Sequence, residues 1–172
     1  MALDISKIEV VTAEVHKDFL RRAYQYAREN SDNPGTHTGA VVVAEKAIIS
    51  GANRFPDGVK KLPERLEKPL IYDWIPHAEF DIMWEATNIG LSLKGSTMYL
   101  PWFPCDRCAW LISGSGIERL ISHKQMLELG NGDQYGFEVA YQMLKEAGIK
   151  MLMYDGKIGG VKHLFRGKVW EP

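Results

Sequence analysis

The sequence predicts an α/β fold in which one mixed five-stranded sheet is covered by helices on both faces, a three-layer α-β-α sandwich. Two short apolar segments, at residues 39–43 and 47–50, are typical of a hairpin. From residue 77 onward, helix-like and strand-like segments alternate, which is typical of parallel strands joined by helices. The chain has 172 residues, 45% of them hydrophobic, so it can form a full core, and no repeat or linker divides it. We therefore expect one domain over residues 1–172.

The first part of the chain is predicted to form a helix, a hairpin and a long loop. Apolar residues recur at helical spacing over residues 13–29, and the Asp-Asn-Pro-Gly cluster at 32–35 ends that helix. The hairpin strands at 39–43 and 47–50 follow. Residues 51–76 are rich in proline, glycine and charge. A loop of this length in a compact domain is usually functional.

The second part of the chain is predicted to alternate between helices and strands. Each expected helix places apolar residues on one face, and Gly148 is a typical C-terminal stop for the last one. No element is predicted after residue 155. The expected elements, in chain order, are a helix at 77–89, a strand at 96–100, a helix at 105–113, a strand at 117–121, a helix at 135–147 and a strand at 150–154.

Two short motifs, His77-Ala78-Glu79 and Pro104-Cys105-Asp106-Arg107-Cys108, carry the candidate chemistry. A proline stands one residue before His77 and one before Cys105, which favours a helix N-terminus at each. Cys105 and Cys108, three residues apart on a helix, face the same way and suit one metal ion. One imidazole and two thiolates make three zinc ligands, the number typical of catalytic sites. The chain has only two cysteines, which excludes a four-cysteine structural site within it.

Glu79 supplies the carboxylate that such a site needs for proton transfer. Zinc lowers the pKa of its water to roughly 7, which generates hydroxide at neutral pH. Glu79, beside such a water, can take its proton and release it again to a substrate. A redox role for Cys105 and Cys108 is the alternative, but it leaves His77 and Glu79 without a function.

His-x-Glu followed by Pro-Cys-x-x-Cys is the known signature of the zinc nucleobase deaminases. The chain resembles the cytidine and deoxycytidylate deaminases, and most closely the deoxycytidylate branch. The resemblance also includes the Gly-Ala-Val strand at 39–43, the Gly-x-Asn-x-x-Pro-x-Gly loop at 51–58, and the segments 95–100 and 116–117. It covers about residues 31–121.

The resemblance implies roles for particular residues. His77, Cys105 and Cys108 are expected to hold one Zn²⁺, with Glu79 as the proton shuttle. Asn53 is expected to contact the sugar or the base of the substrate, and backbone N–H groups near Ala78 and Cys105 are expected to hold the carbonyl of the base. Relatives of this kind are usually dimers or hexamers, so a homo-oligomer is implied.

Aromatic and charged residues near these motifs have two interpretations each. Trp102 and Phe103 either form a wall of the pocket and stack on a base, or pack in the core. Two acids, Asp32 and Asp81, replace residue types that the family often carries at these positions, and an acid at Asp32 argues against a phosphate beside it. The loop at 51–76 offers basic residues for a phosphate, but interleaved acids favour a solvated, mixed-charge loop. These basic residues are Arg54, Lys60, Lys61, Arg65 and Lys68.

The predicted function is therefore hydrolytic deamination of a cytosine nucleotide, dCMP to dUMP, with release of ammonia. One alternative is the same chemistry on a free base, guanine, a pterin or a nucleoside. A polynucleotide deaminase is a second alternative, but 21 basic against 22 acidic residues offer no basic track for a strand. No segment is typical of a signal peptide or a membrane span, so a cytoplasmic location without a membrane partner is expected. His16, His37, His123 and His163 are interpreted as surface or structural residues.

Overall fold

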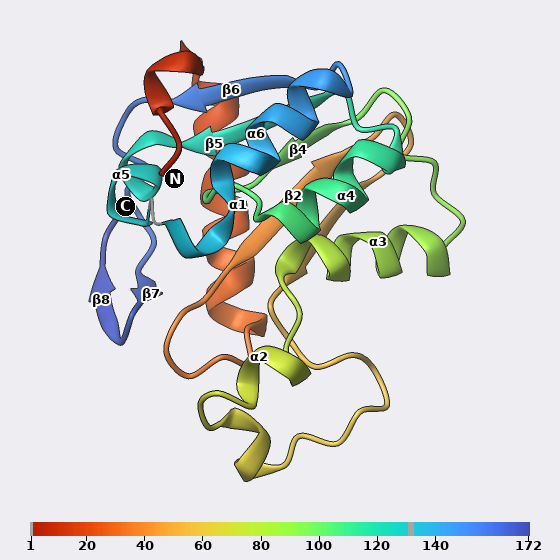
Figure 1. The fold of residues 1–172 in the computed structure, drawn as a ribbon, viewed down its shortest axis with the longest axis vertical. Helices are drawn as coiled ribbons and strands as arrows, with labels where there is room; N and C mark the ends of the chain where they lie inside the picture. The colour runs from red at the N-terminus through yellow and green to blue at the C-terminus, as the bar shows by residue number, and fades with distance from the viewer. Residues whose placement is uncertain (1, 131–132) are drawn as a thin grey trace.

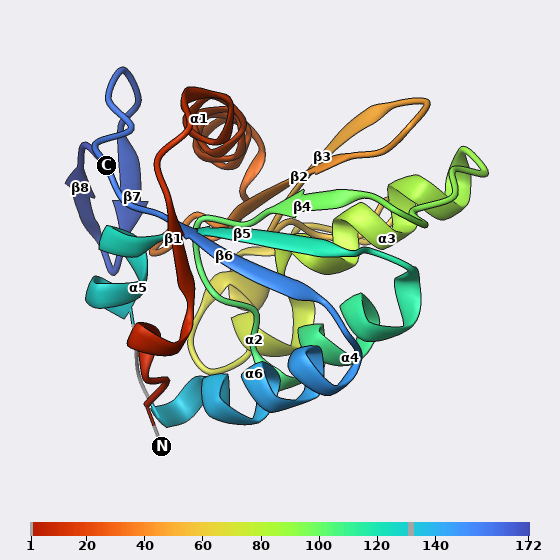
Figure 2. The same cartoon turned by 90° about the horizontal axis from the view of Figure 1, so that it is seen from above.

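A computed structural model, which describes residues 2–130 and 133–172, contains a central mixed six-stranded sheet with helices on both faces (Figure 1; Figure 2). The strand order is β1-β6-β5-β4-β2-β3. The first four of these strands are parallel to one another, whereas β2 runs antiparallel to both β4 and β3. The three-layer α/β prediction is confirmed. The strands are β1 (Glu9–Val11), β2 (Gly39–Val43), β3 (Ile48–Ala52), β4 (Thr97–Tyr99), β5 (Arg119–His123) and β6 (Lys150–Tyr154).

The sheet has one strand more than the sequence predicts, because β1 gives almost no sequence signal. It is three residues long, pairs with β6 at the edge of the sheet, and exposes two of its three residues. A strand of this kind shows neither a continuous apolar run nor an alternating pattern. The other five strands lie within a few residues of their predicted positions.

The helices divide between the two faces of the sheet, as Figure 2 shows. Helix α1 lies on one face, where Leu20 and Tyr24 pack with Val41 of β2. Helices α3, α4 and α6 lie on the other face, where their apolar side chains pack with Ala40 and Val42. The alternation along β2 thus serves both layers, as expected for a strand buried on both faces. The helices are α1 (Glu14–Asn30), α2 (Ile71–Trp74), α3 (Ala78–Asn88), α4 (Asp106–Ser115), α5 (Lys124–Gly130) and α6 (Phe137–Glu146), with short 3₁₀ turns at Ile5–Lys7, Pro63–Leu66 and Asp133–Tyr135.

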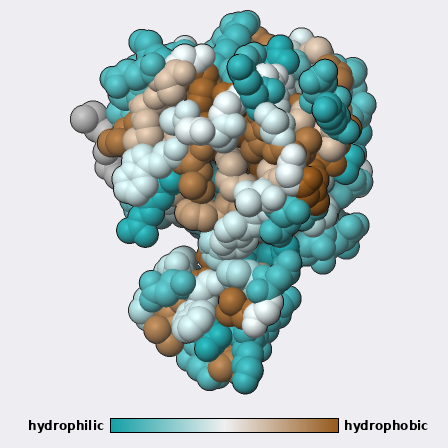
Figure 3. All heavy atoms as spheres, turned by 90° about the vertical axis from the view of Figure 1, so that its right-hand side faces the viewer, coloured by the Kyte–Doolittle hydropathy of each residue, from teal (hydrophilic) through white to brown (hydrophobic). Residues whose placement is uncertain are grey.

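Three segments without a predicted element adopt defined conformations, one of them the short helix α5. The segment 53–76 projects from the sandwich (Figure 1; Figure 3) around a small core of Phe55, Ile71 and Ile75. The C-terminal residues form a separate hairpin of β7 (His163–Phe165) and β8 (Lys168–Trp170). Among the described residues, no helix has both the length and the apolar character needed to cross a membrane.

Candidate active site

Two helix N-termini place the predicted metal ligands next to one another. His77 is the N-cap of α3 and Cys105 is the N-cap of α4, both with extended backbone, and Cys108 lies in the first turn of α4. The prolines before His77 and Cys105 therefore lie one residue outside each helix and not within its first turn. Helix N-termini carry partial positive charge, which favours thiolates and carboxylates close to them.

The three donor atoms have the spacing of a tetrahedral metal site. His77 Nδ1 lies 3.5 Å from the Sγ of Cys105 and 3.5 Å from the Sγ of Cys108. All three donor atoms lie within 4.8 Å of one another. Zinc bonds of ordinary length at tetrahedral angles place nitrogen and sulfur roughly 3.6 Å apart. The residues present therefore fit a zinc ion.

The three donor groups shift one another's pKa values through hydrogen bonds and charge. The pKa of Cys105 is lowered to about 4, mainly because the Cys108 thiol donates a hydrogen bond to its sulfur. The pKa of Cys108 is raised, by that same hydrogen bond and by burial. Burial alone would lower the pKa of His77, but the hydrogen bond with Cys105 and the charge of Glu79 raise it to about 9. A metal ion bound by these donors would displace the protons of the two thiols.

Glu79 lies in the first turn of α3 beside the three donors. Glu79 is only 4% exposed, and this burial raises the pKa of its carboxyl group. Together with His77 and Cys105, it lines a narrow cleft of about 40 Å³ whose walls include Trp102 and Phe103. The arrangement thus offers a buried carboxylate next to the metal donors in a small, largely apolar cleft.

The predicted substrate contacts lie in three different environments. Trp102 and Phe103 line the narrow cleft, and Phe103 also packs against Phe137, with ring centroids 5.9 Å apart. Both interpretations of Phe103, pocket wall and core residue, therefore describe the structure. Ala78 is fully buried at the start of α3.

Asn53 lies farther out, where it lines a wider cavity of about 660 Å³ that also borders His77 and Trp102. Its Oδ1 accepts hydrogen bonds from the Ser31 hydroxyl at 2.7 Å and from the Thr38 N–H at 2.8 Å. These bonds, with one from Nδ2 to the Thr36 carbonyl, hold the amide in a fixed orientation at the cavity wall.

Aromatic residues that the sequence analysis did not select complete the cleft. The Tyr135 ring stacks on Phe137 with centroids 5.2 Å apart and contacts Trp102 at 5.2 Å. Both Tyr135 and Phe137 line the cleft beside Glu79. Both lie at the start of a predicted helix, a position that gives no signal of a pocket in the sequence.

Asp32 and Asp81, the two acids that depart from the family pattern, form hydrogen bonds with other residues of the fold. Asp81 accepts hydrogen bonds from the Ala52 N–H and from Arg54, and Asp32 accepts from the Phe55 N–H and from Lys61. Arg54 and Lys61 are thus paired with acids, as the mixed-charge interpretation of the loop predicts.

The histidines outside the motifs lie apart from the metal donors. The His123 side chain pairs with the Tyr24 hydroxyl at 2.8 Å, and His163 is 4% exposed. Both are buried, and both rings pack against the Tyr24 ring of α1. His16 contacts the Tyr99 hydroxyl at 3.1 Å. These contacts are structural.

Comparison of the chain with known proteins points to a family with a zinc site, in agreement with the metal donors described above. Residues 13–124, about two thirds of the chain, match the family model of the cytidine and deoxycytidylate deaminase zinc-binding region. An uncharacterized deaminase in the luxG 3′ region of Aliivibrio fischeri is 28% identical over 122 residues, covering 70% of this chain and 81% of that protein. Human deoxycytidylate deaminase is 33% identical over 111 residues, covering 60% of this chain, and the chain spans 61% of the human protein.

A solved structure supports the fold. The dCMP deaminase from the cyanophage S-TIM5, in complex with dCMP and dUMP, superposes with a TM-score of 0.65 at 19% identity. The superposition covers 83% of this chain and 98% of the phage protein. The family model names a zinc-binding region, and the His77, Cys105 and Cys108 donors can hold that metal. The chain belongs to the cytidine and deoxycytidylate deaminase family.

Proposed function

We propose that this protein is a zinc-dependent deaminase of a cytosine nucleotide that converts dCMP and water to dUMP and ammonia. The observation that carries the proposal is the position of Glu79, a buried carboxylate beside three zinc-type donors in a small aromatic cleft. The similarity to curated deoxycytidylate deaminases supports the choice of substrate.

Each residue of the site has a role in this reaction. His77, Cys105 and Cys108 would hold the zinc ion, which would lower the pKa of a bound water to roughly 7. Glu79 accepts a proton from the attacking water and delivers it to the ring nitrogen next to the reacting carbon. It then carries a second proton to the amino group, which leaves as ammonia while the ring carbon keeps the oxygen.

The shape of the site suits a planar base followed by a polar sugar. Trp102, Phe103 and Tyr135 provide aromatic surface on which a pyrimidine ring can pack. The Asn53 amide borders the wider cavity, where the sugar of a nucleotide would lie, and its hydrogen bonds with Thr36 and Thr38 fix its orientation.

The substrate is tested by ammonia release from a panel of dCMP, CMP, dCTP, deoxycytidine, cytosine, guanine and a short single-stranded DNA. The zinc-loaded protein is expected to have its highest kcat/KM for dCMP. Faster turnover of guanine or of a free base would keep the zinc chemistry and overturn the nucleotide assignment. Turnover confined to the DNA, and steeply weakened by salt, would favour the polynucleotide alternative.

A further inference from the structure

The wide cavity next to the candidate active site is bordered by two cationic side chains. Lys68 and Arg166 both line it, as does His77, so the cavity is continuous with the metal donors. Among the described residues that line the cavity, none is an aspartate or a glutamate. Its volume of about 660 Å³ is more than ten times that of the narrow cleft at Glu79. The region therefore attracts an anion and has room for a group that extends out of the cleft.

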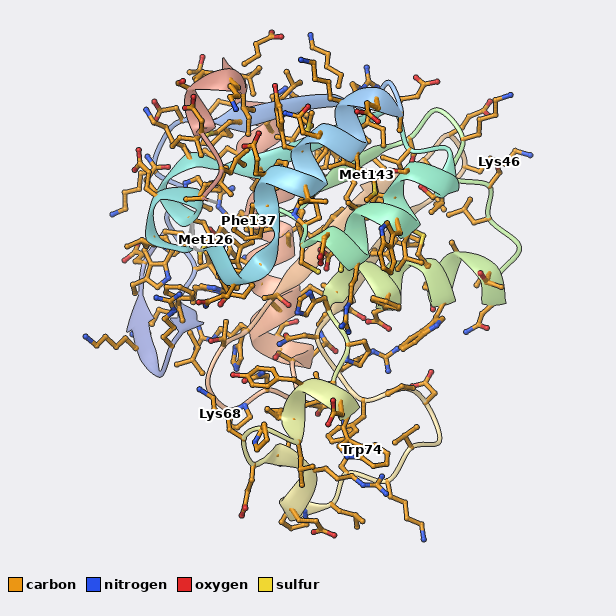
Figure 4. All side chains as sticks on the ribbon, viewed as in Figure 1. Lys46, Lys68, Trp74, Met126, Phe137 and Met143 are labelled. Carbon is orange, nitrogen blue, oxygen red and sulfur yellow. The ribbon has the colours of Figure 1, made fainter. Side chains whose placement is uncertain are left out.

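The two cations come from segments distant in sequence. Lys68 lies just before α2 on the projecting segment, on the side that faces the hairpin in Figure 4. Arg166 occupies the turn between β7 and β8, with a left-handed backbone (φ 50°). Lys68 lies nine residues before His77, whereas Arg166 lies far from both zinc motifs in sequence and beyond residues 13–124 that match the family model.

Hydrogen bonds fix the hairpin turn at the cavity. The Arg166 N–H donates to the Thr36 hydroxyl at 3.1 Å, and the Gly167 N–H donates to the Gly35 carbonyl at 2.7 Å. The His37 N–H donates to the Leu164 carbonyl at 3.0 Å. The loop before β2 thus anchors the hairpin turn and keeps Arg166 at the cavity wall. The same loop also forms hydrogen bonds with the Asn53 side chain.

Arg54 and Lys61 of the projecting segment are paired with carboxylates, whereas, among the described residues, Lys68 and Arg166 are not; the Arg166 guanidinium lies over the Phe165 ring, 5.0 Å from its centroid. Arg54 pairs with Asp81 at 2.8 Å and with Asp57 at 2.6 Å, and Lys61 pairs with Asp32 at 2.7 Å. In the described part of the chain, no carboxylate lies within 4.0 Å of Lys68 or of the Arg166 guanidinium. Asp32 is directed to Lys61 and to the Phe55 N–H, so its charge is balanced locally.

We infer that Lys68 and Arg166 form an anion subsite that binds the phosphate of the nucleotide whose base reaches Glu79. A guanidinium binds phosphate oxygens through paired N–H donors, and an ammonium adds a second point charge. The inference rests on the proposed function. It identifies the substrate class as a phosphorylated nucleotide and assigns its selection to the C-terminal hairpin.

The test compares dCMP with deoxycytidine, which differ only by the phosphate. In R166Q and in K68Q, the ratio of kcat/KM for dCMP to that for deoxycytidine is expected to fall at least tenfold, mainly through KM for dCMP. R166K is expected to restore part of the ratio. K168Q removes one positive charge from the same hairpin without bordering the cavity, and serves as the matched control.

A second readout separates this inference from the proposed function. Calorimetric binding of dUMP and deoxyuridine to the zinc-loaded protein is expected to show tighter binding of dUMP, and R166Q is expected to remove the difference. If no cytosine compound is deaminated but dUMP still binds through Arg166, the proposed function fails and the subsite stands. If dCMP is deaminated and R166Q and K68Q leave the ratio unchanged, or reduce both substrates equally, the subsite is wrong.

Discussion

Arg54 and Asp81 join the end of β3 to the helix that carries Glu79. The guanidinium donates from Nε to Asp81 Oδ2 at 2.9 Å and pairs through Nη2 with Oδ1 at 2.8 Å. The Ala52 N–H donates to the same Oδ2 at 3.0 Å, and the Asp81 side chain is only 3% exposed. Asp81 lies two residues after Glu79, so this pair fixes the first turn of α3 against the sheet.

Removal of the Asp81 carboxylate is expected to destabilise the protein. Asp81→Ala leaves the Arg54 guanidinium and the Ala52 N–H without their buried partner, at a cost of about 2–3 kcal/mol. Arg54→Gln is expected to cost less, because that side chain is 26% exposed. Urea unfolding of both single variants and of the double variant measures the coupling. Additive losses would show that the pair does not act as a unit.

Close packing between β3 and α3 makes Gly51 necessary. A Cβ at this position would lie 2.7 Å from the Ala78 carbonyl oxygen and 3.0 Å from the Ile82 nitrogen. Gly51→Ala must therefore displace α3, with His77 and Glu79, and we expect loss of both zinc content and deaminase activity. Gly114→Ala, within α4, has no heavy atom within 4 Å of the new Cβ and is the matched control. Retention of full activity in Gly51→Ala would contradict the described packing.

Metal removal is expected to expose the only two thiols of the chain. Cys105 is partly exposed and Cys108 is buried, and both are free of disulfides. In the zinc-loaded protein neither thiol should react with a thiol reagent, whereas after chelation Cys105 should react first. Chelation should also lower Tm, because a ligand that binds only the folded state stabilises it. Two equally reactive thiols before chelation would exclude a metal bound by both.

Stability is expected to fall in mild acid through His163. Burial, with the charges of His37 and His123, lowers the pKa of His163 to about 3, whereas an unfolded histidine titrates near 6.5. Between these values the unfolded state binds more protons, so stability decreases as pH falls, by at most about 1.4 kcal/mol per pH unit for this group. Urea unfolding at pH 7 and pH 5 should show a smaller loss for His163→Gln. An equal loss in both proteins would contradict this origin.

The sequence predicts much of the fold because its periodic segments coincide with the elements of the sandwich. The apolar run at 39–43 forms β2, and the two helices at the zinc motifs, α3 and α4, begin within one residue of their predicted starts. The hairpin of β7 and β8 was not predicted. Each strand has three residues, and the hairpin is held by tertiary contacts, such as His163 on the Tyr24 ring at 4.8 Å. Such contacts leave no periodic signal.

The residues of the candidate site also fall into two groups, those that the sequence predicts and those that only the fold brings together. The sequence is enough to identify four residues of the site, because two helix N-termini position them and their spacing is typical of a catalytic zinc site. These residues are His77, Glu79, Cys105 and Cys108. Arg166 and Tyr135 reach the cavity only through the fold, so nothing in their neighbourhood in the sequence indicates it. The partners of Asp32 and Asp81 are equally invisible in sequence, since Lys61 and Arg54 lie 29 and 27 residues away.

The most direct test measures zinc content and dCMP turnover on the same samples of wild type, Glu79→Gln and Glu85→Gln. Glu85→Gln removes a carboxylate from the same helix, outside the cleft. We predict one zinc per chain in all three proteins, with dUMP and ammonia formed in equal amounts by wild type and Glu85→Gln. Glu79→Gln should lose about 10²–10⁴-fold in kcat. Full turnover by a zinc-loaded Glu79→Gln protein would contradict the role of Glu79 in proton transfer, and no turnover by zinc-loaded wild type would contradict the dCMP deaminase assignment.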